Sequence, residues 1–127
     1  MPNRKIFVFG SNRAGRHGAG AAKHAVDHYG AVYGKGQGLQ GQSYAIPTKD
    51  KQMHTLPLDE IRLGVMAFLD LARQRPDLEF YVTRIGCGLA GYRDEQIAPF
   101  FRTATENVRF DTRWLQYLPG HKDWGST

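Results

Sequence analysis

The sequence predicts a single α/β domain, a three-layer α/β/α sandwich on a mixed, mostly parallel sheet, and two observations lead to this prediction. First, a strand, a glycine-rich loop and a helix follow one another twice along the chain, with a further strand and helix between them. Second, the first strand is apolar on both faces, which is typical of a strand covered by helices on each side. The 127 residues suffice to bury a core without a disulfide or metal scaffold.

The first half of the chain contains two predicted strands and one predicted helix. Apolar, β-forming residues predict a central parallel strand over residues 5–10 and a second strand over residues 43–48, whose Pro47 is expected to end the ladder. Between them, apolar residues at helical spacing predict a helix that ends at Gly30. Residues 30–42 hold five glycines without any periodicity and are expected to form a mobile loop.

The second half begins with the clearest helix of the sequence. This helix is predicted to start near Pro57, to carry acidic residues in its first turn and to end before Pro76. A third strand is expected over residues 79–85. A final helix is expected with Asp94 as its N-cap, kinked or delayed by Pro99.

The C-terminal segment is the least regular part of the sequence. Residues 113–118 are compatible with an edge strand, and residues 121–127 are expected to form a flexible tail. The single domain is therefore expected to span residues 1–120. No internal repeat or low-complexity tract interrupts this range.

The positive charge of the chain is concentrated in its N-terminal part. The formal net charge is +5, and residues 1–54 contain eight lysines and arginines against two acidic residues. Nine of the 15 glycines lie in the same part. This pattern suggests an anionic partner that meets flexible backbone there, although a modest net charge also serves solubility alone.

Membrane and secreted classes are disfavoured by the sequence. No segment approaches the length of about 18 apolar residues that a membrane span requires, and the apolar stretch at the N-terminus is too short for a signal peptide. Cys87 is the only cysteine and cannot form an internal disulfide. We therefore expect a cytoplasmic protein without a membrane partner.

Two glycine-rich loops leave the carboxyl ends of predicted strands, at residues 10–20 and 86–91. Bare backbone N–H groups beside a helix N-terminus bind phosphates, so two such loops side by side predict an elongated cleft able to hold a diphosphate. The glycine spacing fits neither a dinucleotide-binding fingerprint nor a Walker loop. The alternative is that the glycines serve only tight turns and close packing.

The second loop carries the most specific motif. Residues 84–91, R-I-G-C-G-L-A-G, resemble the R-I-G-C-G-L element of the ADP-ribose-binding macrodomains, in particular the subfamily that removes single ADP-ribose groups from acidic side chains. Residues 11–12 with residues 18–22 resemble the first macrodomain loop, and residues 44–49 are similar to the strand of that subfamily that ends in Thr-Lys. The chain also resembles small uncharacterised bacterial and phage proteins that share F-G-S-N and I-G-C-G-L-A-G-Y.

The resemblance implies a macrodomain-like fold that binds ADP-ribose or a related nucleotide, with an ADP-ribosylated macromolecule as a further candidate partner and with no cofactor. It implies that Lys49 is the nucleophile that attacks the anomeric carbon of the ribose. The residues implied to bind the ligand are Ser11, Asn12, Gly18, Ala19, Gly20, Thr48, Gly86, Cys87, Gly88, Leu89, Ala90, Gly91 and Tyr92.

One departure from the subfamily bears on catalysis. Ala90 stands where the subfamily has its catalytic aspartate, so no side chain at this position can transfer a proton. Asp50, beside Lys49, and Asp94 are candidates to replace it. Hydrolysis of ADP-ribosyl adducts and non-catalytic binding, as a receptor or sponge for a nucleotide signal, therefore both stay open.

Other functional classes receive less support. A nucleic-acid-binding domain would fit the basic sequence, but the chain has no run of Lys and Arg and no obvious aromatic platform. His24 and His28 have the spacing of a zinc pair but lack a third ligand, so no metal site is expected. Lys49 is also compatible with a solvated lysine at a strand end, and Cys87 with a buried thiol.

Overall fold

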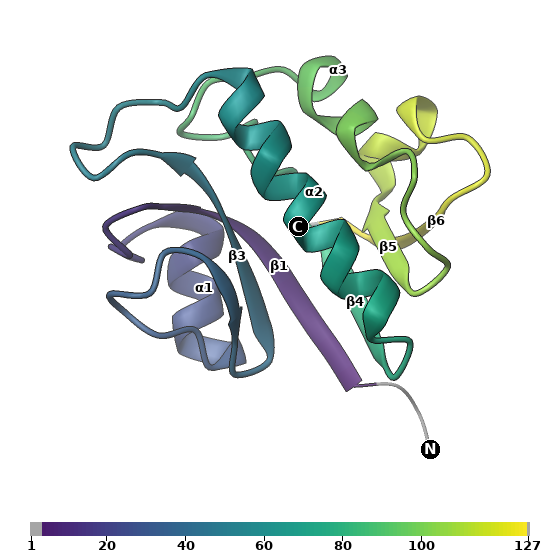
Figure 1. Ribbon diagram of the computed structural model, residues 1–127, viewed down its shortest axis with the longest axis horizontal. Helices are drawn as coiled ribbons and strands as arrows, with labels where there is room; N and C mark the ends of the chain where they lie inside the picture. The colour runs from purple at the N-terminus through teal and green to yellow at the C-terminus, as the bar shows by residue number, and fades with distance from the viewer. Residues whose placement is uncertain (1–3, 127) are drawn as a thin grey trace.

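A computed structural model describes residues 4–126, which form an α/β fold around a mixed six-stranded sheet (Figure 1). The strand order is β2-β3-β1-β4-β5-β6; β2 is antiparallel to β3, and all other neighbours are parallel. The strands are β1 (Arg4–Asn12), β2 (Gly38–Gln40), β3 (Ser43–Lys49), β4 (Leu78–Val82), β5 (Val108–Asp111) and β6 (Lys122–Gly125). The helices are α1 (Gly20–Tyr29), α2 (Leu58–Gln74), α3 (Asp94–Ile97) and the 3₁₀-helices η1 (Ala98–Phe101) and η2 (Thr112–Tyr117). The predicted α/β class and mixed, mostly parallel sheet are confirmed.

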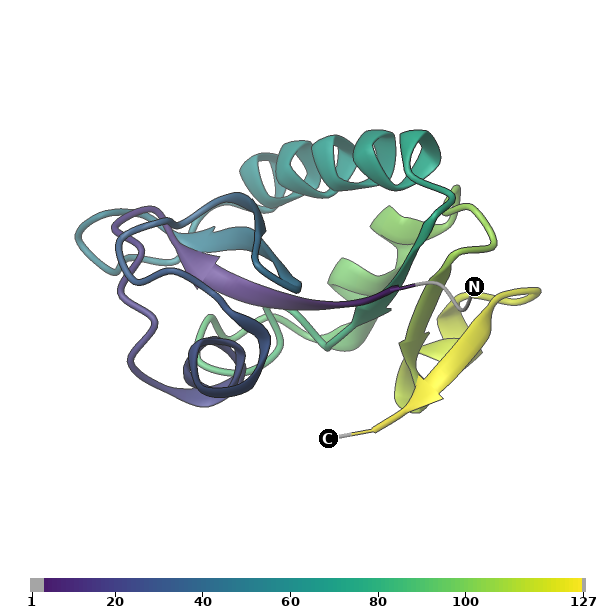
Figure 2. The ribbon, with the colours of Figure 1, turned by 90° about the horizontal axis from the view of Figure 1, so that it is seen from below.

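Strand β1 supplies side chains to two separate cores. Ile6 and Val8 belong to the larger core, which α2 and η1 cover, whereas Phe7 and Phe9 belong to a smaller core under α1. Successive side chains of a strand point to opposite faces of the sheet, so a strand covered on both faces must be apolar at every position. Figure 2 shows α1 and α2 on opposite sides of β1.

Both long helices follow the predicted periodicity. Helix α2 buries one apolar stripe, formed by Ile61, Val65, Phe68, Leu69 and Ala72. Helix α1 ends as predicted at Gly30, whose φ of 71° is a left-handed conformation that glycine adopts without strain.

The prediction that Pro47 ends its strand is wrong, because β3 continues to Lys49. Strand β2 pairs with β3 only as far as Ala45, where Gly38 is its partner. The backbone groups of residues two apart, such as Ala45 and Pro47, point to the same edge of a strand. The nitrogen of Pro47 therefore points to the β2 edge, at a position that β2 does not reach. Proline is tolerated there because no ladder hydrogen bond is required of it.

The predicted irregular loop at residues 30–42 contains strand β2 and is anchored to the first glycine-rich loop. The Gly34 N–H donates to the Gly15 carbonyl oxygen at 2.8 Å, and His17 Nε2 lies 2.9 Å from the Lys35 carbonyl oxygen. A β-carbon on Gly36 would lie 2.2 Å from the Asn12 carbonyl oxygen, so only glycine permits this approach. A three-residue strand without apolar alternation leaves no periodic signal in the sequence.

The third strand and the last helix are shorter than predicted. Strand β4 ends at Val82, and residues 83–92 leave the sheet as a loop. Arg93, not Asp94, is the N-cap of α3. Pro99 lies in the first turn of η1, so the predicted helix is divided into one α-helical turn and one 3₁₀ turn.

The C-terminal predictions need correction in two places. Residues 113–118 are not a strand, because Thr112–Tyr117 form η2 with the Asp111 side chain accepting the Arg113 N–H at its start. The tail expected at residues 121–127 contains β6, which pairs with β5 and extends the domain beyond residue 120. The indole N–H of Trp124 also donates to the Val82 carbonyl oxygen at 2.9 Å.

An ion pair joins the loop after β4 to the C-terminal part of the fold. Arg84 donates to both carboxylate oxygens of Asp94 at 2.7 and 2.8 Å, and the Trp114 indole N–H donates to the same carboxylate at 2.7 Å. The Arg84 guanidinium, supported by the Trp114 indole, holds the pKa of Asp94 below its ordinary value although burial opposes this shift.

This ion pair predicts a pH-dependent stability. Because the pKa of Asp94 is lower in the folded than in the unfolded protein, the ion pair stabilises the fold at pH values above the unfolded pKa of about 3.9. This stabilisation is lost as the pH falls through the lower pKa of the folded state. We expect Asp94→Asn to unfold more readily than wild type at pH 7 and to differ less from wild type near pH 3. Urea denaturation at both pH values measures this. The exposed ion pair of Asp70 provides a control, since Asp70→Asn should change stability little at either pH. An equal loss for Asp94→Asn at both pH values would contradict the prediction.

Candidate functional site

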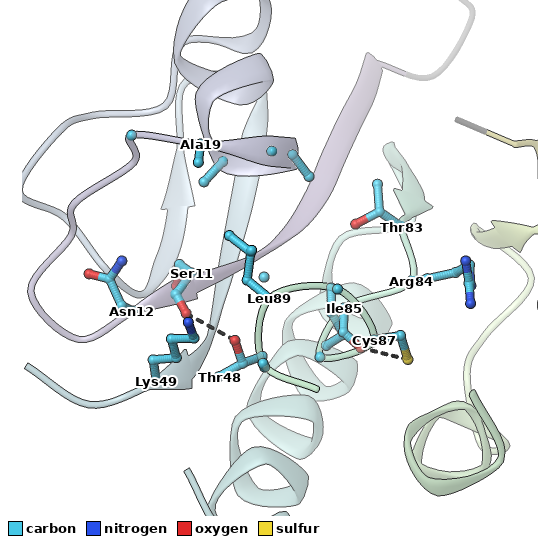
Figure 3. Close-up of a pocket in the computed structure, with 18 of the residues that line it drawn as sticks. Ser11, Asn12, Ala19, Thr48, Lys49, Thr83, Arg84, Ile85, Cys87 and Leu89 are labelled. Carbon is cyan, nitrogen blue, oxygen red and sulfur yellow. Dashed lines mark hydrogen bonds between the residues drawn. The ribbon is translucent and has the colours of Figure 1, made fainter. Parts of the chain in front are cut away.

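A cavity of about 660 Å³ lies at the carboxyl ends of β1, β3 and β4. The chain leaves β1 toward α1 on one face of the sheet and leaves β4 toward α3 on the other face. Adjacent parallel strands whose connections diverge in this way create the crevice in which open α/β sheets bind ligands. Figure 3 shows the cavity and the side chains around it.

The floor of the cavity is the point where three segments touch. A β-carbon on Gly10 would lie 3.6 Å from the backbone nitrogen of Gly86, the side chain of Ile85 and the side chain of Thr48. The Thr48 hydroxyl donates to the Ser11 carbonyl oxygen at 3.2 Å (Figure 3). The ends of β1 and β3 and the loop after β4 are therefore held in direct contact.

The first wall is the loop between β1 and α1. The Asn12 side chain shapes it, since its Oδ1 accepts the Arg16 N–H and its Nδ2 donates to the Arg16 carbonyl oxygen, both at 2.9 Å. The Ser11 hydroxyl donates to the Gly36 carbonyl oxygen. Ser11 and Asn12, both predicted for the site, line the cavity, but their side-chain hydrogen bonds hold the loop between β1 and α1 in place.

The amino end of α1 opens into the same cavity. Ala19, its N-cap, supplies no side-chain hydrogen bond, and the first turn contains no acidic residue. Gly20, Ala21 and Ala22 line the cavity at this end. The N–H groups of a first helical turn have no acceptor within the helix and carry the positive end of the helix dipole, so this wall attracts anions.

The second wall is the loop at residues 86–90. No residue that the structure describes accepts a hydrogen bond from the N–H groups of Gly88, Leu89 and Ala90. The loop turns at Gly86, whose φ is 76°, and the Leu89 side chain is 78% exposed at its tip. Three backbone donors without an acceptor therefore belong to residues that line the cavity, an arrangement that suits a negatively charged ligand.

The charged side chains that line the cavity are all cationic. Arg16, Lys49, Arg84 and Arg113 line it, and no aspartate or glutamate does so among residues 4–126. Arg84 is paired with Asp94 at 2.7 Å and Arg113 with Asp111 at 2.8 Å. The Nζ of Lys49, which lies beside Ser11 and Asn12 in Figure 3, has no acceptor in the described part of the chain. The cavity therefore favours an anionic ligand.

Most residues predicted for the site meet around this one cavity. They are Ser11, Asn12, Gly18, Ala19, Gly20, Thr48, Lys49, Gly86, Cys87, Gly88, Leu89 and Ala90. Three predicted residues lie outside its lining, namely Asp50, Gly91 and Tyr92. The Tyr92 hydroxyl donates to the Leu56 carbonyl oxygen at 2.7 Å, which directs this side chain toward the larger core.

Neither carboxylate considered as a replacement for the missing aspartate reaches the cavity. Asp50 Oδ1 accepts the N–H groups of Gln52 and His54, each at 2.9 Å, and so closes the turn after β3. Asp94 is held by Arg84 and Trp114. Both side chains have structural hydrogen bonds that account for their positions.

Cys87 has the environment of an unreactive thiol. Its sulfur lies 3.4 Å from the Ile85 carbonyl oxygen. Burial raises the pKa of the thiol to about 12, with a further contribution from the Asp94 carboxylate. The thiolate required of a nucleophile is therefore disfavoured at neutral pH.

Several lining residues escaped the sequence analysis. Arg16 lies within the first glycine-rich loop, and this position could have indicated that it lines the cavity. Tyr33, Met53 and Arg113 come from segments without a motif and reach the cavity only through the fold.

No grouping of three histidine, cysteine, aspartate or glutamate side chains suited to a metal ion occurs within residues 4–126. His24 and His28 lie side by side, with ring centroids 4.6 Å apart. None of the helices described is both long enough and apolar enough to span a bilayer. Comparison with protein-family models, with curated proteins and with solved structures found no match to this chain.

The second wall provides a test of how strictly the loop depends on glycine. A β-carbon on Gly86 would lie 3.3 Å from two atoms of Ile97, and the backbone of Gly86 is in a left-handed conformation. A β-carbon on Gly88 would project into open space. We expect Gly86→Ala to lower the free energy of unfolding by about 2 kcal/mol. The matched variant Gly88→Ala should change it by less than about 0.5 kcal/mol. Urea denaturation of both variants measures the difference, and equal values would contradict this account of the loop.

Proposed function

We propose that the cavity binds ADP-ribose or a closely related diphosphate-containing nucleotide, on a three-layer, macrodomain-like α/β/α sandwich. The observation that carries the proposal is a cavity lined by cations and free N–H groups, without a carboxylate among its described lining, at the divergence of two strand connections. Its volume of about 660 Å³ lies within the range of about 300–1,000 Å³ that is usual for small-molecule sites.

The two walls suit the two charged groups of a diphosphate. In the proposed complex the phosphates lie between the loop that carries Gly88, Leu89 and Ala90 and the amino end of α1, both of which line the cavity. Hydrogen bonds from backbone N–H groups to an anion are short and strong because the acceptor is charged. The floor at Gly10 gives the ligand close access to the sheet edge.

Apolar atoms are available for the remainder of such a ligand. Ile85, Ala22 and Met53 line the cavity, and the exposed Leu89 extends from the rim. A nucleoside presents flat apolar faces with polar edges, so contact with these side chains excludes water from the faces. Tyr33, which is exposed and also lines the cavity, is a candidate stacking partner for the base.

Lys49 supports an anionic end of the ligand and is the nucleophile that the resemblance implies. Hydrolysis of an ADP-ribosyl ester consumes a water and releases a carboxylate, and it needs a group that accepts a proton from the attacking atom. Ala90 offers no such group, and Asp50 and Asp94 are bonded elsewhere. Binding without turnover is therefore the function that we propose, and hydrolysis is the second candidate because the Nζ of Lys49 has no acceptor among the described residues.

Calorimetric titration with ADP-ribose tests the proposed site. We expect a Kd on the order of micromolar for wild type. Gly88→Glu places a carboxylate in the cavity beside the diphosphate, and like charges in contact should weaken binding by about a hundredfold or more. Gln74→Glu, an exposed residue at the end of α2, makes the same charge change away from the cavity and should bind like wild type. Absence of binding at millimolar ADP-ribose in wild type would refute the proposal.

A second measurement separates binding from turnover. Loss of a charge-assisted hydrogen bond in Lys49→Ala should weaken ADP-ribose binding by about tenfold. When wild type is incubated with a mono-ADP-ribosylated protein, mass spectrometry should recover the adduct intact. Release of free ADP-ribose by wild type but not by Lys49→Ala would instead establish the hydrolytic function.

A further inference from the structure

A second groove lies on the α1 face of the sheet, between α1 and the strands β1, β4 and β6. It has a volume of about 270 Å³ and shares no lining residue with the cavity described above. Its lining residues are Lys5, Ile6, Phe7, His24, Tyr29, Tyr81 and Trp124. Figure 2 shows α1 beneath the β1 side of the sheet and no helix beneath β6, so this part of the face is uncovered.

Two pairs of nearly parallel aromatic rings line the groove. The rings of Phe7 and Tyr29 are 4.7 Å apart at an angle of 5°, and those of Tyr81 and Trp124 are 5.9 Å apart at 15°. The hydrogen bond from the Trp124 indole to the Val82 carbonyl oxygen fixes the second pair on the sheet. Tyr29, Tyr81 and Trp124 are half-buried, so their rings are partly exposed to solvent and held in place.

The charges around these rings are mainly positive, and the one carboxylate beside them among the described residues, that of Glu79, is hydrogen-bonded to Tyr81. The Lys5 ammonium lies 5.0 Å from the centre of the Tyr81 ring, and no residue that the structure describes forms an ion pair with it. Tyr81, Arg109 and Lys122 are register partners on the neighbouring strands β4, β5 and β6. Their side chains therefore lie on the same face of the sheet. Glu79, the acidic neighbour on β4, is already paired with Arg109 at 3.2 Å.

This combination selects among possible occupants. The place that a cationic ligand would take over an aromatic ring is filled by Lys5, and a second cation would be repelled. A planar group that carries negative charge instead matches both the rings and the ammonium groups. In a double helix the faces of the bases are already stacked on one another, so only an unpaired strand can offer them to protein rings.

We propose that this groove binds single-stranded nucleic acid, with bases stacked on Tyr29 and on Trp124 and with phosphates beside Lys5 and Lys122. No helix lies beneath β6 on this face (Figure 2), and the positive net charge of +5 favours the approach of a nucleic acid. The three half-buried rings of Tyr29, Tyr81 and Trp124 lie far apart in the sequence, so the groove exists only in the folded chain. This inference does not depend on the ligand of the cavity.

Fluorescence anisotropy with a labelled oligothymidylate of about ten nucleotides tests the proposal, with a duplex of equal length for comparison. Wild type should bind the single strand more tightly than the duplex, and binding should weaken as salt is added. Trp124→Ala should weaken binding by about tenfold or more through loss of stacking. Lys5→Gln, an exposed substitution that leaves the cores intact, should weaken binding and reduce the salt slope by about 1.

Two control variants locate the binding. Arg102→Gln removes one exposed charge at the end of η1, on the opposite side of the sheet, and should bind like wild type. Gly88→Gln obstructs the cavity without changing the charge and should also bind the strand normally. The proposal fails if wild type does not bind at low salt, if Gly88→Gln alone abolishes binding, or if Lys5→Gln and Arg102→Gln behave alike. It also fails if sedimentation shows that Trp124 mediates a dimer, since a second copy would then occupy the groove.

Discussion

The fold depends on the contacts of a single strand. Alternate side chains of β1 enter two cores on opposite faces, while its backbone pairs with β3 on one side and β4 on the other. At its carboxyl end the three strands lie so close together that a β-carbon on Gly10 would contact Thr48 and Ile85. The cavity therefore owes its floor to the same strand that organises the hydrophobic interior.

The two walls of the cavity are stabilised in different ways. The first is held by short-range bonds of Asn12 and by the anchored segment that contains Gly36. The second is tied through Arg84 and Asp94 to the Trp114 indole, and hence to the C-terminal part of the chain. Backbone donors in both walls are thus positioned before any ligand binds, which lowers the entropic cost of binding.

Local signals in the sequence predicted the central strand, both long helices and the left-handed end of α1 at Gly30, because periodicity and glycine placement act within a few residues. They failed for β2, β5 and β6, which are short and become strands only by pairing with neighbours. The same division holds at the cavity. Its glycine-rich walls were visible as motifs, whereas Arg113 and Tyr33 reach it from segments that carry no motif of a binding site.

The proline in β3 has a consequence for the behaviour of the molecule in a crowded solution. An exposed strand edge offers hydrogen-bonding groups to any extended chain that meets it, and proteins that leave such edges open tend to aggregate. Beyond Ala45, β2 no longer pairs with β3. The outer edge of β3 continues with Pro47, which has no N–H, and ends at Lys49, which forms a bridge with Thr55. An incoming strand cannot complete a ladder there, so the rim of the cavity next to Lys49 is protected from adventitious pairing with other chains.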